Sequence, residues 1–158
     1  MKHSSKVPRT DRTRNADPAT SRAQVIVYGV AALLAMAGLA DATYLTVQFL
    51  SGETAVCGGS ADCFRVLGSV YSKIGRVPVS GLGAIAYFAT FTFATFAAFG
   101  YARARRFFAI MVWTMFAATL WFLYVQAFLL HAFCRYCLFS AAIVFLLTGL
   151  VVATPGRD

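Results

Sequence analysis

The stretch Cys134-Arg135-Tyr136-Cys137-Leu138, which continues as a mostly apolar run to Ala153, decides the fold. Residues 134–153 are 20 positions, and an α-helix of that length rises about 30 Å, the thickness of the hydrocarbon core of a bilayer. The run reaches that length only if the Cys-x-x-Cys motif opens the helix. The sequence therefore predicts a membrane-spanning helix with two cysteines at its amino-terminal end.

Three further apolar runs precede this one, at residues 25–50, 80–101 and 107–130. The chain is 59% hydrophobic and 13% charged, and its charges are confined to short stretches between the runs. This pattern predicts an all-α integral membrane protein, a bundle of four transmembrane helices. The domain boundaries follow: a disordered basic tail at 1–24, a four-helix transmembrane domain at 25–153 and a short tail at 154–158.

The first run could instead belong to a signal peptide, because Ala40-Asp41-Ala42 has the small-x-small form of a cleavage site. Apolar residues continue past that point to Leu50, and a signal peptide would not need this length. We therefore interpret the run as a retained span.

The basic residues give an orientation. The net charge is +8, and the charge is concentrated in the amino-terminal tail and in a short turn at Arg103–Arg106. The positive-inside rule places both, with the two termini, in the cytoplasm. No folded basic face is present to bind nucleic acid. All four cysteines then fall on the outer, oxidising side, where disulfides persist: Cys57, Cys63, Cys134 and Cys137.

Cys134 and Cys137 have the spacing of a redox-active dithiol. The amino terminus of a helix favours a thiolate, and Arg135 adds positive charge between the two thiols. Two alternatives remain open. The pair could be a structural disulfide, or it could form a zinc site together with Cys57 and Cys63. The wide spacing of that second pair and the oxidising compartment weigh against zinc, so no metal site is predicted.

Cys57 and Cys63 form a wider pair on the longest loop, where Gly58 and Gly59 allow mobility. A mobile cysteine pair near a fixed pair is what an electron relay needs. The alternative is a structural disulfide that only closes the loop. Residues 64–74 carry apolar residues at helical spacing and are too short to span. We expect a short amphipathic helix in this first outer loop, which covers the dithiol and brings Cys63 close to Cys134, or else serves only as an interfacial anchor.

Asp41 and His131 are further candidates. An acid inside a span is a functional candidate by default, although Asp41 could equally be a buried structural group. His131 lies at the outer end of the third span, where it could transfer protons or act as an interfacial anchor.

Several motifs follow one another in order over most of residues 25–145: Gly38-Leu39-Ala40-Asp41-Ala42-Thr43-Tyr44-Leu45-Thr46, Cys57-x5-Cys63, Ser69-Val70-Tyr71-Ser72, Gly75-Arg76-Val77-Pro78, Gly83-x3-Tyr87 and Cys134-Arg135-Tyr136-Cys137-Leu138. In this order and spacing the chain resembles the vitamin K epoxide reductase family in its bacterial form. The resemblance implies a thiol oxidase and quinone reductase in the cytoplasmic membrane of a bacterium. The quinone would be of the menaquinone, ubiquinone or vitamin K type, and the reaction would support disulfide bond formation.

The resemblance also implies roles for the cysteines. A reduced thioredoxin-like partner of the DsbA type would attack the Cys57–Cys63 disulfide at Cys57. Cys63 would then attack Cys134, and Cys137 would face the quinone. Many bacterial members carry a fused thioredoxin-like domain, and this chain ends too soon for one, so a separate soluble partner is implied.

Asp41 and His131 are then candidates for residues near the quinone, and the resemblance adds three more. Ser69 falls where the family has a hydroxyl near the active site. Ala141 and Val79 stand where the animal enzymes have a tyrosine and an asparagine, which implies reduction of a quinone rather than of vitamin K epoxide.

Two rivals remain. In a quinone-coupled oxidase of the DsbB type, the Cys-x-x-Cys motif lies in the first outer loop and the spaced pair in the second, the reverse of the order here. A non-enzymatic membrane protein would use the cysteines as staples or metal ligands.

Overall fold

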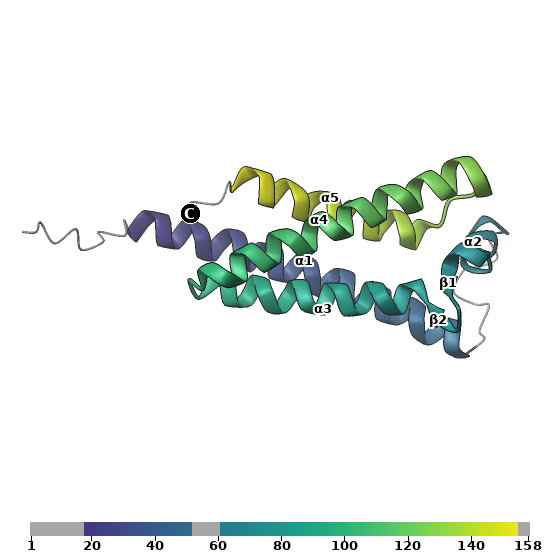
Figure 1. Ribbon diagram of the computed structural model, residues 1–158, viewed down its shortest axis with the longest axis horizontal. Coiled ribbons are helices and arrows are strands. Elements are labelled where there is room, and N and C mark those ends of the chain that lie inside the picture. Colours follow the sequence, from purple (N-terminus) through teal and green to yellow (C-terminus); the bar gives the residue numbers. More distant parts are fainter. Residues whose placement is uncertain (1–17, 52–60, 155–158) are drawn as a thin grey trace, which may run out of the picture.

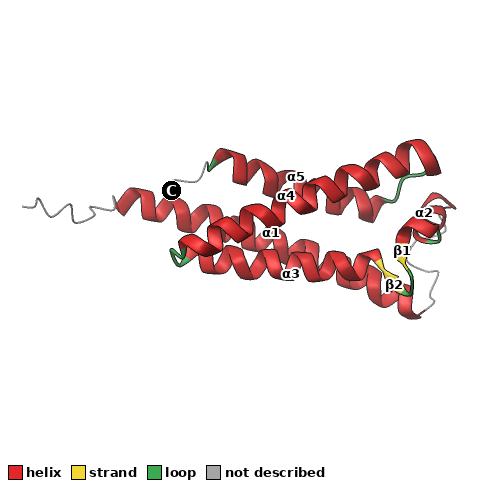
Figure 2. Cartoon of the chain, viewed as in Figure 1, coloured by secondary structure: helices red, strands yellow, loops and turns green. Residues whose placement is uncertain are grey.

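The structure, a computed structural model, describes residues 18–51 and 61–154. Its four long helices are α1 (Pro18–Ser51), α3 (Val79–Ala98), α4 (Ala102–Tyr124) and α5 (Arg135–Ala153), and they pack into one elongated bundle (Figure 1). The shorter elements are α2 (Ala61–Leu67), the 3₁₀ turn η2 (Val70–Ser72), the two-residue strands β1 (Lys73–Ile74) and β2 (Val77–Pro78), and the π-helical turn η3 (Val125–Leu130), which continues α4. Helix dominates the described chain (Figure 2), so the predicted all-α bundle is confirmed.

Within the described residues, four helical segments are long and apolar enough to cross a membrane: Arg22–Ser51, Val79–Ala98, Ala102–Leu130 and Arg135–Ala153. Large apolar side chains point away from the bundle on each of them, among them Leu33, Ile85, Phe128 and Leu146. An apolar exterior of this kind suits lipid, and all backbone groups within a helix are satisfied internally. The protein is therefore a multi-pass membrane protein.

The described chain begins and ends at the same end of the bundle (Figure 1). The opposite end carries α2, the β1–β2 hairpin and the connection into α5. In the hairpin, Ile74 pairs with Val77, and Gly75 turns the chain with a φ of 65°. This end of the bundle holds the cysteines of the described chain, because Cys63 lies in α2 and Cys134 directly precedes α5.

Small residues allow α1 and α3 to approach each other closely. Gly38 of α1 faces the ring of Tyr87 on α3, and a Cβ added at Gly38 would overlap that ring. One turn further along α1, Ala42 lies against Gly83 of α3. Small residues at helix contacts are the usual means of close packing in membranes, where no hydrophobic driving force acts between helices.

We expect Gly38→Ala to destabilise the bundle by about 1–3 kcal/mol, because Tyr87 has to move to make room for the new methyl group. Thermal unfolding in detergent measures the change. The matched control is Gly29→Ala on the same helix, where a Cβ meets nothing within 4 Å. That variant should be as stable as the parent or gain up to about 1 kcal/mol from helix propensity. Equal melting temperatures for the two variants would contradict the prediction.

Several predicted boundaries were wrong. Helix α1 begins at Pro18, so residues 18–24 are helical rather than part of the polar tail. Proline at the first helical position loses no hydrogen bond and has a φ suited to the helix. The residues predicted as a basic turn, Arg103–Arg106, lie inside the first turns of α4. The chain reverses earlier, at Gly100, whose φ of 91° is readily accessible to glycine. Residues 1–17 and 155–158 lie outside the described residues.

The helix predicted over residues 64–74 is broken. Helix α2 ends at Leu67, and the chain continues as η2 and β1. The Ser69 hydroxyl donates to the carbonyl oxygen of Val66 at 2.8 Å, and the Ser72 hydroxyl donates to that of Leu67 at 2.6 Å. Serine side chains that bond to nearby backbone in this way favour turns over a continued helix. The amphipathic pattern identified the buried face of α2 and overestimated its length.

Candidate active site

The dithiol lies where the chain turns into α5. Cys134 precedes the helix in extended conformation, with φ −95° and ψ 121°, and its carbonyl oxygen accepts the N–H of Leu138 at 3.0 Å. Cys137 therefore lies on the first turn of α5. Both thiols are free, with Cys134 fully buried and Cys137 half-buried. The Cys-x-x-Cys motif thus opens the last helix. The length of the apolar run at residues 134–153 had required this position.

The preceding turn holds Cys134 in place. His131 ends η3 in the left-handed conformation, with a φ of 49°. The N–H of Ala132 then bonds to the carbonyl oxygen of Gln126 at 3.2 Å, and the N–H of Cys134 bonds to Oε1 of the same glutamine at 3.1 Å. Gln126 thus satisfies two backbone donors of a segment that has no regular structure. π-helical turns of this kind are frequently found at functional sites.

Helix α2 covers this segment. Cys63 and Val66 of α2 form one buried cluster with Ala132 and Cys134. Cys63 is 2% exposed and Cys134 0%, and Cys63 is disulfide-bonded. Cys57 lies outside the described residues. The structure therefore brings the loop cysteine that it describes into the same cluster as the first cysteine of the dithiol.

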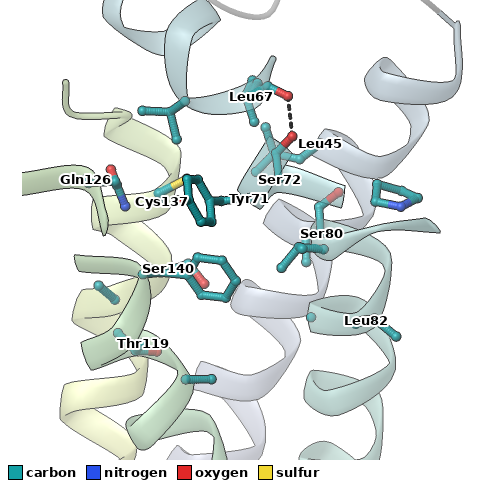
Figure 3. A pocket seen from close by; sticks show the side chains of 18 of the residues that line it. Leu45, Leu67, Tyr71, Ser72, Ser80, Leu82, Thr119, Gln126, Cys137 and Ser140 are labelled. Carbon is teal, nitrogen blue, oxygen red and sulfur yellow. Dashed lines mark hydrogen bonds between the residues drawn. The ribbon is translucent and has the colours of Figure 1, made fainter. Parts of the chain in front are cut away.

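A cavity of about 650 Å³ opens inside the bundle beside the dithiol. All four long helices, α2 and η2 contribute to its lining, which is mostly apolar. Figure 3 shows Cys137, Ser140, Gln126 and Tyr71 around this space. Cys137 lines the cavity, and Cys134 is absent from its lining. The two thiols of the pair thus have different surroundings, one facing the cavity and the other packed beneath α2.

The sequence model of one protein family, the vitamin K epoxide reductase family, matches residues 30–152, which is most of the chain. The chain belongs to this family. Family membership makes the protein a membrane thiol–disulfide oxidoreductase, and family members use quinones. A comparison with curated proteins found no match.

Four of the five residues predicted near the quinone line the cavity with Cys137: Asp41, Ser69, Val79 and Ala141. They come from α1, from the segment before η2, from α3 and from α5, so only the folded bundle brings them together. His131 is exposed and is not part of the lining. The structure gives His131 a role in the turn before the dithiol and does not bring it to the cavity.

Asp41 differs from the other polar groups of the lining. Its Oδ2 is buried and has no hydrogen-bond partner in the described part of the chain. A buried carboxylate oxygen without a partner is costly and points to a ligand or a proton. Within residues 18–51 and 61–154, no three His, Cys, Asp or Glu side chains gather where they could hold a metal. A site that also uses Cys57 lies outside the described residues.

The sequence did not reveal two groups in this site. One is Gln126. The other is a contact between α3 and α5, in which the hydroxyls of Tyr87 and Ser140 lie 2.7 Å apart. Both residues line the cavity. Tyr87 belonged to a family motif without a role, and Ser140 carried no signal because its contact spans 53 positions.

The surroundings of Cys134 stabilise its thiolate. Hydrogen bonding from the Cys137 thiol, helped by the backbone N–H groups of Cys137 and Tyr136, lowers the pKa of Cys134 to about 6 in spite of burial. The backbone N–H groups at the helix amino terminus contribute to this shift, and the Cys137 thiol is the larger influence. Arg135 instead lies over the ring of Tyr136, 5.2 Å from its centroid. Cys134 is therefore the thiol of the reduced pair that loses its proton more readily.

The ultraviolet absorbance of the thiolate should rise with a midpoint near pH 6 in reduced protein whose loop cysteines are changed to serine. Cys137→Ala should move this midpoint up toward about 8.5, the ordinary value for a thiol, because the main hydrogen-bond donor is lost. Cys134→Ser lacks this thiolate and therefore gives the background absorbance. An unchanged midpoint in the Cys137→Ala protein would show that another group stabilises the thiolate.

Proposed function

We propose that this protein is a thiol oxidase of the bacterial cytoplasmic membrane that reoxidises a soluble thioredoxin-like (DsbA-like) partner and passes the electrons to a membrane quinone. Disulfide bonds can then form in exported proteins. One observation carries the proposal. The dithiol is divided between two surroundings, since Cys134 packs with Cys63 under α2 and Cys137 lines the cavity. A relay from a protein partner to a membrane acceptor needs this division.

The thiol chemistry balances. The partner reduces the disulfide of the loop pair, and the Cys63 thiolate attacks Cys134 in the Cys134–Cys137 disulfide, which releases Cys137 as a thiolate. Cys57 then attacks Cys63, so that the loop disulfide re-forms and both inner cysteines are reduced. A disulfide-bonded Cys63 beside a free Cys134 and Cys137 corresponds to this stage. A lowered thiol pKa makes Cys134 a good leaving group in such exchange.

The cavity suits a quinone ring. Its volume of about 650 Å³ lies within the usual range for small-molecule sites, and its mostly apolar lining with a few polar groups is typical of them. When bound, a quinone would accept two protons and two electrons; the dithiol would supply both electrons and one of the protons as it returns to a disulfide. Ser69, Val79 and Ala141 would contact the ring, and Asp41 offers a carboxyl group that can hold a proton.

The charges support the sidedness. Arg103, Arg105 and Arg106 lie at the start of α4, at the end of the bundle opposite to α2. The positive-inside rule makes that end cytoplasmic. The cysteines then face the outside, where a soluble partner can reach α2.

The test is reduction of a short-chain 1,4-naphthoquinone by the purified full chain, with either a reduced DsbA-type protein or dithiothreitol as the electron donor. We expect Cys57→Ala to reduce turnover with the protein donor to background, because the partner has lost its point of attack. Dithiothreitol should still support turnover, since a small dithiol can reduce the inner pair directly.

Two outcomes would contradict the proposal. A wild-type chain that reduces no quinone with either donor cannot be a quinone-coupled oxidase. Full turnover of Cys57→Ala with the protein donor would show that electrons enter by another route.

A further inference from the structure

Gln126 is an unusual residue for its position. It lies in a segment that spans the membrane, in the π-helical turn η3, and is only 3% exposed. A buried primary amide is costly in such surroundings unless its donors and acceptor are satisfied. Its side chain lines the cavity together with Cys137 (Figure 3).

The oxygen atom of this amide has a hydrogen-bond partner. The backbone N–H of Cys134 can only donate, so the atom that it meets at 3.1 Å must be the amide oxygen. This contact fixes the orientation of the amide group, which would otherwise have two possible settings. The nitrogen, Nε2, then points away from Cys134 and carries two donor hydrogens. No described residue accepts a hydrogen bond from Nε2.

Three other hydroxyls of the lining are engaged. Ser69 and Ser72 donate to backbone oxygens of the α2–η2 segment, and Ser140 lies in its pair with Tyr87. Asp41 offers an unpartnered oxygen, which accepts a hydrogen bond when the group is ionised and can donate one when it is protonated. Gln126 is thus a buried donor with a free hydrogen at the wall of the cavity, and the group that satisfies it must carry an acceptor atom.

We propose that Gln126 determines specificity for the electron acceptor: its Nε2 donates a hydrogen bond to a carbonyl oxygen of the acceptor, while its Oε1 holds the backbone of Cys134. This inference rests on the proposed function, since it assigns a residue to the same cavity. The substrate class is then a carbonyl-bearing ring, and a flat apolar ring without a carbonyl gains nothing from Gln126. One side chain fixes both the reducing pair and the acceptor.

The contact also favours the reaction. Negative charge develops on a carbonyl oxygen as electrons arrive, and a donor already aimed at that oxygen binds it more strongly as the charge grows. Because Gln126 is held by Cys134, no reorganisation is needed at that moment. Gln126 therefore binds substrate, and through Oε1 it is also a positioning residue for the dithiol.

Nuclear magnetic resonance of the full chain labelled with ¹⁵N in its glutamine side chains tests the contact directly. The glutamines are Gln24, Gln48 and Gln126, so the spectrum is simple, and Gln126→Met identifies the signal. We add a 1,4-naphthoquinone to the oxidised protein, which cannot consume it. The Gln126 amide protons should shift downfield on binding, with the Gln24 signal unmoved.

Affinity gives a second readout. Gln126→Met should bind the naphthoquinone about tenfold more weakly, the effect of one neutral hydrogen bond. The same substitution should leave the affinity for naphthalene, which has no carbonyl, unchanged. Thr148→Val is the matched control, because it removes another buried polar group that bonds only within α5 and does not line the cavity.

These measurements distinguish failure of the proposed function from failure of the Gln126 assignment. If the wild-type chain neither binds nor reduces the naphthoquinone, the proposed function fails. If it does both while the Gln126 signal stays in place and Gln126→Met binds within twofold of the wild type, only the assignment of Gln126 is overturned. An equal loss of affinity for naphthalene would likewise overturn it, because the residue would then act through packing.

Discussion

Replacing Cys137 with alanine should abolish quinone reduction with either electron donor, so that the rate falls to that of the uncatalysed reaction. Cys137 is the only cysteine in the described part of the chain that lines the cavity, and Cys134 lies fully buried behind it. Without the Cys137 thiol, the inner pair cannot return to a disulfide, and two electrons have no way to leave together. Loss of naphthoquinone absorbance measures the rate.

The same variant should accumulate an intermediate that the wild type passes through quickly. Cys63 and Cys134 share one buried cluster, so the Cys134 thiolate can attack Cys63 in the loop disulfide, which releases Cys57 as a thiolate. No Cys137 thiol is then present to attack Cys134 in the resulting mixed disulfide. Mass spectrometry under non-reducing conditions should detect this bond. The control is Thr148→Val on the same helix, which should keep wild-type turnover. If Cys137→Ala turns over quinone as fast as the control, Cys137 is not the point of contact.

The sequence was sufficient for the parts of the fold that depend on composition along the chain. The apolar runs are long enough to define four spans, and the length of the last run placed Cys134 at its beginning. Errors arose where local chemistry competes with periodicity. Residues 64–74 have a helical pattern, yet Ser69 and Ser72 bond to nearby backbone and end α2 early.

The rest of the site could not be predicted because it depends on contacts between distant residues. Gln126 is one polar residue in an aromatic run, and its role becomes visible only once His131 reverses the chain and brings Cys134 back to it. Ser140 likewise acquires a partner only when α5 packs near Tyr87. His131 is the opposite case. Its residue type suited either proton transfer or an interfacial anchor, and the structure places it in a turn, exposed and outside the cavity lining.

Asp41→Asn should slow quinone reduction about a hundredfold, within the range of general acid–base catalysis, with little change in KM. Asp41 lines the cavity, and its Oδ2 has no partner among the described residues. The reaction moves two protons with its two electrons, and a thiolate at Cys134 leaves the dithiol one proton short. A carboxyl group at this place can supply that proton, whereas an amide of the same shape cannot. Stopped-flow reduction of the naphthoquinone measures the step.

A second effect of the same substitution separates proton transfer from simple damage to the site. The Asp41 carboxylate is a minor influence that raises the pKa of Cys134, so Asp41→Asn should move the thiolate midpoint to lower pH. The Cys134 thiolate would then be more abundant while quinone reduction is slower, and a distorted site would not combine these changes. The control is Asp62→Asn in the exposed first turn of α2, which should change neither quantity. A normal rate in Asp41→Asn would show that Asp41 does not supply the second proton.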